Sequence, residues 1–274
     1  MAVTMQEISH LRKMTGAGMM DCKKALEEAQ GDFDKAIEII RKKGQAVAAK
    51  RSDREAAEGC VLAADKGDFA AIVAVKCETD FVAKNADFVA LTQEVLDLAM
   101  SKQPKDAEEL KSLPLADGRT VAEHITDRSG ITGEKMELGY YDFVKGASTI
   151  SYIHPGNMLA SIVAFNEEAE HQVARDVAMQ VAAMNPLGLN PESVPQHLID
   201  QEKEIARDKA REAGKPENLL DRIAEGSLNK FFKENTLLMQ DSVKNNKETV
   251  EQMMKNSSKT LTATDFKRFT LNVD

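Results

Sequence analysis

The spacing of apolar residues changes several times along the 274-residue chain, and this limits the possible folds more than any other feature. Residues 1–45 carry apolar side chains three and four positions apart, which is the period of one helix face. Residues 60–75 instead hold short, continuous apolar runs that are typical of buried strands. Residues 189–238 contain few apolar residues among many charged ones. Such a chain is expected to form an α+β protein built from several parts.

The first 45 residues are expected to form a three-helix module. Three successive stretches repeat the helical spacing, and a glycine separates each from the next. Their apolar residues are Met5, Ile8 and Leu11, then Cys22, Ala25, Leu26 and Ala29, then Phe33, Ala36, Ile37 and Ile40. A charge cluster with little apolar content follows, so residues 46–58 are expected to be a partly helical linker.

The middle of the chain is expected to form a two-part core, with a first half at 59–135 and a second half at 136–188. In the first half, two apolar runs flank the turn residues 65–68, which predicts a β-hairpin. In the second half, the strands 147–154 and 158–165 are separated by a His-Pro-Gly-Asn turn.

A faint internal repeat supports two related halves. The segment Ala71–Val75 (AIVAV) is similar to Ser161–Phe165 (SIVAF), which lies 90 positions later. Each segment is followed by an acidic break and a helical stretch, the first with Asn85 as its expected cap. We therefore expect two units of strands and a helix, with antiparallel sheets.

Residues 189–238 are expected to form a protruding antiparallel helical hairpin. Gly214–Pro216 lies near its middle as a helix stop and restart, and the thin apolar seam is typical of a coiled coil. Residues 239–274 are expected to return to the core as a short helix at 248–255 and a final strand that completes a sheet. The alternating apolar residues of that strand are Phe269, Leu271 and Val273.

Composition excludes several classes of function. A net charge of −9 argues against general nucleic-acid binding, because phosphate backbones require a local excess of positive charge. The three cysteines are widely spaced and form no C-x-x-C pair, so we expect neither a disulfide framework nor a zinc site. The N-terminus lacks the apolar region of a signal peptide, and no 18-residue apolar run exists. A cytoplasmic protein without membrane contact is expected.

No catalytic motif stands out, so the protein is not expected to be an enzyme or to need a cofactor or metal. The five histidines are scattered, and neither G-x-S-x-G nor a phosphate-binding P-loop occurs. Cys77 is expected to be a buried strand residue rather than a nucleophile. Thr15–Gly18 is expected to be a tight turn between helices rather than an anion site. Residues 41–51 hold five basic groups without aromatic neighbours, which favours a solvated helix over an RNA site.

Two short segments are candidates for contact with another protein. Met19 and Met20 cannot both be fully buried in so small a module. One can face its core, and an exposed one beside Leu11 and Arg12 would form an apolar contact patch for another protein. A loosely packed core edge is the alternative. Phe81 lies where a strand has ended and a helix has not begun, on an expected loop tip. It either presents a wedge to a partner or packs back on the following helix, and the pattern supports both.

These segments resemble the two signature motifs of the elongation factor Ts family. The first motif comprises Leu11, Arg12 and the run TGAGMMDCKKAL at 15–26, and the second is TDFVAK at 79–84. The resemblance continues through His154–Gly156 and the Gly214–Pro216 hairpin to the last strand. It therefore covers nearly the whole chain.

The resemblance implies a guanine-nucleotide exchange factor for elongation factor Tu. It also implies an N-terminal module like a ubiquitin-associated domain, a two-part α+β core and a protruding coiled coil. The residues implied to contact Tu are Arg12, Met19, Met20 and His154. Those implied to enter beside its nucleotide site and help dislodge Mg²⁺ are Thr79, Asp80, Phe81 and Val82. Pro155 follows the histidine, where the family commonly has glycine.

A non-catalytic adaptor is the alternative function. The three-helix module would then bind a helix or a ubiquitin-like surface, and residues 189–238 would mediate self-association. The expected partner is elongation factor Tu, both GDP-bound and nucleotide-free, without direct contact to membrane or nucleic acid.

Overall fold

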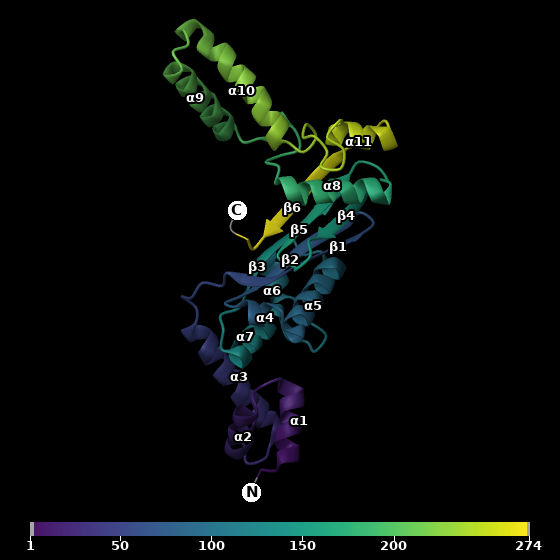
Figure 1. Ribbon diagram of the computed structural model, residues 1–274. Coiled ribbons are helices and arrows are strands. Elements are labelled where there is room, and N and C mark those ends of the chain that lie inside the picture. Colours follow the sequence, from purple (N-terminus) through teal and green to yellow (C-terminus); the bar gives the residue numbers. More distant parts are fainter. Residues whose placement is uncertain (1–2, 273–274) are drawn as a thin grey trace. The chain divides into compact units, whose positions relative to one another are not determined.

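The computed structural model describes residues 3–272, which form two compact units (Figure 1). Within the described residues, the first unit comprises residues 3–62, 73–141 and 271–272, and the second comprises residues 63–72 and 142–270. Helices and two three-stranded sheets, in the orders β1-β2-β3 and β4-β5-β6, confirm the expected α+β class. The strands are β1 (Glu58–Lys66), β2 (Phe69–Cys77), β3 (Glu137–Lys145), β4 (Ser148–Ile153), β5 (Leu159–Phe165) and β6 (Ala263–Thr270).

The described helices of the first unit precede and follow the β1–β2 hairpin in the chain. They are α1 (Met5–Thr15), α2 (Met19–Glu28), α3 (Phe33–Lys50), α4 (Asp80–Ala83), α5 (Ala86–Lys102), α6 (Ala107–Ser112) and α7 (Val121–Thr132). The described helices of the second unit are α8 (His171–Met184), α9 (Gln196–Glu212), α10 (Leu220–Asn235) and α11 (Val250–Ser257), with 3₁₀ turns at Pro191–Ser193 and Glu217–Leu219. None of the helices in the described residues is both long and apolar enough to cross a bilayer.

Helices α1, α2 and α3 form the three-helix module with its own small core. Leu11, Cys22 and Leu26 are fully buried in it. The Thr4 hydroxyl accepts from the Glu7 N–H at 3.2 Å and begins α1, and Gly16 ends it with a left-handed φ of 71°. The turn between α1 and α2 is therefore the tight connection expected from the sequence.

Helix α3 is longer than expected and runs through the first part of the predicted linker. The boundary placed after residue 45 falls inside this helix, which ends at Lys50. Residues 46–50 are rich in alanine, the strongest helix former, so the helix continues where apolar material becomes sparse.

The extended α3 packs on α7 at a pair of glycines. A Cβ atom placed on Gly130 would lie only 2.1 Å from the Cα of Gly44, so the two backbones approach closely. Arg41 of α3 adds an ion pair to Asp127 of α7 at 3.9 Å. The three-helix module is thus attached to the rest of the first unit through α3 rather than through a loose connection.

Strands β1 and β2 form the predicted hairpin, and both repeat segments are central strands. Gly67 adopts a φ of 62° in the two-residue connection, a conformation that glycine accepts without strain. The segment Ala71–Val75 lies in β2 and Ser161–Phe165 lies in β5, each the middle strand of its sheet.

Strand β3 differs from expectation. It was expected to begin the second half, but it completes the sheet of β1 and β2, because the almost wholly buried β2 requires a partner on both edges.

The second sheet is antiparallel and is packed against α8. The Ser161 hydroxyl donates to the Ala178 carbonyl of α8 at 2.7 Å. Strand β6 pairs with β5, as predicted, but ends at Thr270, earlier than the sequence suggested. Thr270 pairs with Leu159, the first residue of β5, so no partner remains for Leu271 in that strand. Val273, also expected in the strand, lies outside the described residues.

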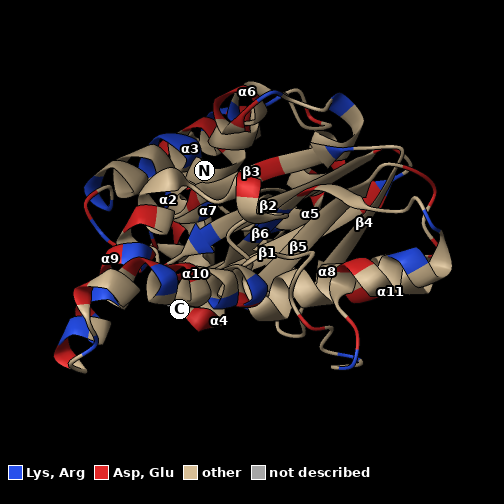
Figure 2. Ribbon diagram, turned by 90° about the horizontal axis from the view of Figure 1, so that it is seen from above, with Lys and Arg blue, Asp and Glu red and all other residues tan. Residues whose placement is uncertain are grey.

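Helices α9 and α10 form the expected helical hairpin and lie side by side (Figure 1). Gly214 adopts a φ of 68° in the turn between them. Arg207 joins the helices through Asp221 at 2.8 Å, and charges of both signs line α9 (Figure 2). The seam is narrow and is made of small and branched residues, namely Ala206, Ala210, Leu220 and Ala224.

Candidate functional site

Phe81 lies on a single helical turn that directly follows the buried strand β2. The segment was expected to be a loop tip, but the N–H of Ala83 bonds to the Thr79 carbonyl at 3.1 Å and forms the turn α4. Ala83 is buried, whereas the Phe81 side chain is 85% exposed. This exposure excludes the alternative in which Phe81 packs back on the next helix, α5. That helix begins at Ala86 and is capped, as predicted, by Asn85, whose side chain accepts from the Asp87 N–H at 2.9 Å.

A charged pair flanks Phe81 on its own turn. Lys84 Nζ lies 2.6 Å from Asp80 Oδ2. This hydrogen bond and the positive charge of Lys84 lower the pKa of Asp80 below its usual value and raise that of Lys84. The turn therefore presents an aromatic ring beside an ionised carboxylate near neutral pH.

Glu134 supports this turn from a distant part of the chain. Its Oε2 atom accepts from the backbone N–H groups of Glu78 and Thr79, each at 3.1 Å. Its Oε1 atom accepts from the Thr79 hydroxyl at 2.6 Å. The start of α4 is thus held by a side chain more than 50 residues later in the sequence.

Met19 and Met20 are both outside the core of the three-helix module. Met19 is 40% exposed and Met20 is 64% exposed, so both lie at the surface, although one of them could have faced the core. They are the first two residues of α2, and the buried Ala17 just before them already occupies that edge of the core. Arg12 is also exposed, on α1 of the same module.

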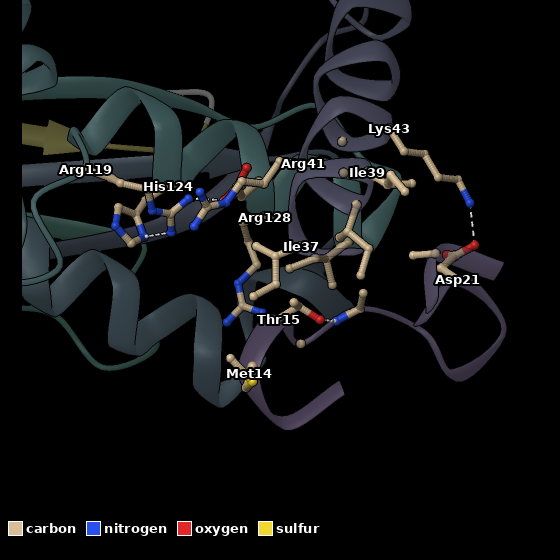
Figure 3. A pocket seen from close by; sticks show the side chains of 18 of the residues that line it. Met14, Thr15, Asp21, Ile37, Ile39, Arg41, Lys43, Arg119, His124 and Arg128 are labelled. Carbon is tan, nitrogen blue, oxygen red and sulfur yellow. Dashed lines mark hydrogen bonds and ion pairs between the residues drawn. The ribbon is translucent and has the colours of Figure 1, made fainter. Parts of the chain in front are cut away.

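A groove of about 800 Å³ opens between the three-helix module and helices α5 and α7 of the same unit (Figure 3). Apolar residues from several helices line it, including Met14, Ile37, Leu91 and Ile131. Arg128 lies at its edge and pairs with Asp87 at 3.3 Å.

A His–Asp pair beside this groove is part of a structural network. His124 Nε2 lies 2.9 Å from Asp117 Oδ1, and Arg119 bonds to the same carboxylate at 2.8 Å. Burial would raise the pKa of Asp117, but the hydrogen bonds from Arg119 and His124 outweigh it and hold the pKa far below its usual value. Arg119 also bonds to Asp127, so the network connects the start of α7 to its middle. Within residues 3–272 no three acidic, histidine or cysteine side chains gather as a metal site would require.

Cys77 is buried in β2, and the basic residues at 41–51 lie on α3 or directly after it. Burial raises the pKa of Cys77 to about 12, and its Sγ atom donates to the Thr79 carbonyl oxygen at 3.3 Å, both of which favour the neutral thiol. Most of the basic groups at 41–51 are paired with carboxylates. These pairs are Arg41–Asp127, Lys42–Glu38, Lys43–Asp21 and Arg51–Glu78.

His154 belongs to the second unit and is exposed in the turn after β4. Its N–H bonds to the Leu159 carbonyl at 2.8 Å, and its Nδ1 atom lies 3.1 Å from the Tyr152 hydroxyl. The ring is therefore oriented by its own hairpin.

Comparison with known proteins identifies the family. The profile of the family described as Elongation factor TS matches residues 78–273. The chain is 71% identical to elongation factor Ts of Porphyromonas gingivalis over 274 residues, which are the whole of both chains. It is 54% identical to that of Azobacteroides pseudotrichonymphae and 48% identical to that of Phocaeicola vulgatus, again over the full length of each chain. The chain belongs to the elongation factor Ts family.

Membership in the elongation factor Ts family confirms the resemblance seen in the two motifs and makes the chain a translation elongation factor. Sequence reasoning missed Glu134 and the exposed Met14, and it placed Met5 on the apolar face of the first helix, although Met5 is 63% exposed. Glu134 follows a helix-ending glycine and belongs to no motif, so only the folded chain reveals its contact with Thr79.

Proposed function

We propose that this member of the elongation factor Ts family is a guanine-nucleotide exchange factor that binds elongation factor Tu in the cytoplasm and promotes GDP release. The 85% exposure of Phe81 is the observation that carries this proposal. Burying a phenylalanine side chain contributes roughly 1.5–3 kcal/mol, and this gain is available only if a partner covers the ring. A turn that presents such a ring to solvent is suited to entering another protein.

The Phe81 turn, defined as residues 79–82, would act as a wedge beside the Mg²⁺ and phosphate groups of the bound nucleotide. Thr79 and Val82 shape the turn, Phe81 inserts, and the Asp80 carboxylate brings negative charge towards the anionic phosphates. Both effects disfavour the loaded state of Tu and leave the emptied state unaffected. The factor therefore binds nucleotide-free Tu more tightly, which by linkage weakens GDP binding by the same factor.

Arg12, Met19, Met20 and His154 would anchor the complex and contribute affinity in every nucleotide state. Methionine side chains are flexible and adapt to a partner surface, and Arg12 adds a charged contact at the edge of the methionine pair. No covalent bond changes during exchange, so this function needs no nucleophile, general base or cofactor.

The first prediction concerns Phe81. Phe81→Ala is expected to reduce stimulated GDP release from purified Tu by about tenfold or more, equivalent to at least ~1.4 kcal/mol of lost transition-state stabilisation. Release is measured by loss of a fluorescent GDP analogue from Tu at saturating factor. Leu219→Ala, which removes another partly exposed apolar side chain at the far end of the helical hairpin, is the control and is expected to leave release unchanged.

Unchanged release by Phe81→Ala would contradict the wedge. Binding to Tu without any stimulated release, even by the unmodified protein, would instead support the non-catalytic adaptor.

A further inference from the structure

We propose that Glu134 is a positioning residue for the Phe81 turn: its carboxylate fixes the backbone at which the turn begins and so sets the direction in which Phe81 is presented. The proposal rests on the proposed exchange function of that turn. Glu134 itself would not touch the nucleotide site of Tu.

The first observation is that Glu134 changes the role of Thr79. Thr79 is the N-cap residue of α4, where a threonine oxygen ordinarily accepts from an N–H of the first helical turn. Here the side chain makes no capping bond, and its hydroxyl instead donates to Glu134 Oε1 at 2.6 Å. Thr79 is thereby tied to the segment after α7 rather than to its own helix.

The second observation is that the connection is reciprocal. Glu134 accepts from the backbone of Glu78 and Thr79, while Glu78 Oε1 accepts from the backbone N–H of Lys135 at 2.6 Å. Two short segments distant in the sequence are thus joined crosswise, each glutamate binding the backbone of the other segment. Two bonds to one charged side chain also restrict the rotation of the peptide between Glu78 and Thr79.

Further contacts hold the two glutamates in place. Arg54 bonds to Glu78 Oε2 at 3.0 Å, and Arg51 lies 3.5 Å from the same oxygen. The backbone N–H of Lys135 and the guanidinium of Arg54 lower the pKa of Glu78, which keeps its carboxylate ionised. The Ser129 hydroxyl donates to the backbone carbonyl of Glu134 and fixes that segment to α7.

A support at this position is needed because α4 has little stability of its own. It is a single turn of four residues, and a helix nucleus of that length is unfavourable without tertiary contacts. The Phe81 ring faces solvent and cannot orient the turn, so its direction depends on the buried Ala83 and on the restraint at Thr79. Without Glu134, Thr79 is free to cap α4 in the ordinary way, and the ring samples more directions.

The test compares Glu134→Ala with Glu134→Gln. A glutamine can keep the whole pattern: its amide oxygen accepts from both N–H groups, and its amide N–H₂ donates to the Thr79 oxygen. At saturating factor, Glu134→Ala is expected to reduce stimulated GDP release roughly tenfold, the effect of losing hydrogen bonds to a charged group, while Glu134→Gln stays within about threefold of the original. Binding to nucleotide-free Tu is expected to change far less than release for both variants.

A double-mutant cycle with Phe81→Ala separates positioning from general stability. If Glu134 acts by aiming Phe81, Glu134→Ala causes little further loss once the ring is absent. Equal losses in both backgrounds, or full release by Glu134→Ala, would overturn the positioning role. If Glu134→Ala does not fold, Thr79→Val takes its place in the test, because this change removes only the hydroxyl that donates to Glu134. GDP release by Thr79→Val at the rate of the original protein would also overturn the proposal. Full release by Phe81→Ala would instead contradict the wedge role of the turn, and a lack of stimulated release by the unmodified protein would contradict the exchange function on which the proposal rests.

Discussion

The first unit exposes several large apolar side chains to solvent. Among its described residues, the large apolar side chains with high exposure are four methionines and one phenylalanine, namely Met5, Met14, Met19, Met20 and Phe81. Methionine adapts its shape to a partner, whereas phenylalanine keeps a fixed ring. This difference is consistent with the separate roles proposed above, in which Met19 and Met20 contribute affinity and Phe81 contributes the selective contact.

Met20 and Met5 form a matched pair for testing the affinity role. They are 64% and 63% exposed on α2 and α1 of the same module. Met20→Lys is expected to weaken binding to nucleotide-free Tu by about tenfold, because burying a charged lysine in place of an apolar contact costs roughly 1–2 kcal/mol. Titration calorimetry measures this change, and Met5→Lys serves as the control.

At saturating factor, Met20→Lys is expected to release GDP at nearly the original rate. Normal affinity of Met20→Lys, or an equal loss in Met5→Lys, would contradict a specific contact at Met20.

The sequence offered candidate residues for the site but could not predict how they lie. Phe81 was identified by its position after a buried strand, but a wedge and a packed-back ring share the same local pattern. The 85% exposure of the Phe81 side chain in the folded chain decides between them. For Met19 and Met20, helical spacing could not show that the preceding Ala17 already fills the core edge.

At the scale of secondary-structure elements, most helices and strands followed from capping residues and apolar spacing. The errors occurred where contacts with other strands or helices decide where an element ends or which sheet it joins. Strand β6 ends where β5 begins to pair with it, and β3 joins the first sheet to satisfy the other edge of β2. Helix α3 extends to Lys50 because alanine-rich sequence favours helix and because its C-terminal half packs on α7.

The crossing of α3 and α7 gives a prediction with an internal control. A Cβ on Gly130 would lie 2.1 Å from backbone atoms of α3, whereas a Cβ on Gly44 would meet Gly130 at an ordinary 3.5 Å. Gly130→Ala is therefore expected to lower the free energy of unfolding by about 1–3 kcal/mol, as overpacking typically does. Gly44→Ala is expected to be neutral or to stabilise by up to about 1 kcal/mol, since alanine favours helix.

Urea titration followed by circular dichroism measures both variants. Equal stability of the two alanine variants would show that the helices do not approach each other at this pair.

At the scale of the whole molecule, the candidate contacts are distributed over both compact units. Arg12, Met19, Met20 and the Phe81 turn belong to the first unit, and His154 belongs to the second. A partner that met all of them would contact both units, with only the Phe81 turn distinguishing loaded from emptied Tu. Exchange is then a coupling between two ligands of Tu rather than a chemical reaction.

The most direct measurement is the affinity of the protein for nucleotide-free Tu compared with its affinity for Tu loaded with GDP and Mg²⁺. Coupling through the wedge predicts that the protein binds the emptied form more tightly than the loaded form by a factor of about 5–150 or more, and that it weakens GDP binding to Tu by the same factor. For Phe81→Ala, the ratio of the two affinities is expected to be close to one. Equal affinity of the unmodified protein for both forms, or an unchanged ratio in Phe81→Ala, would contradict exchange by this turn.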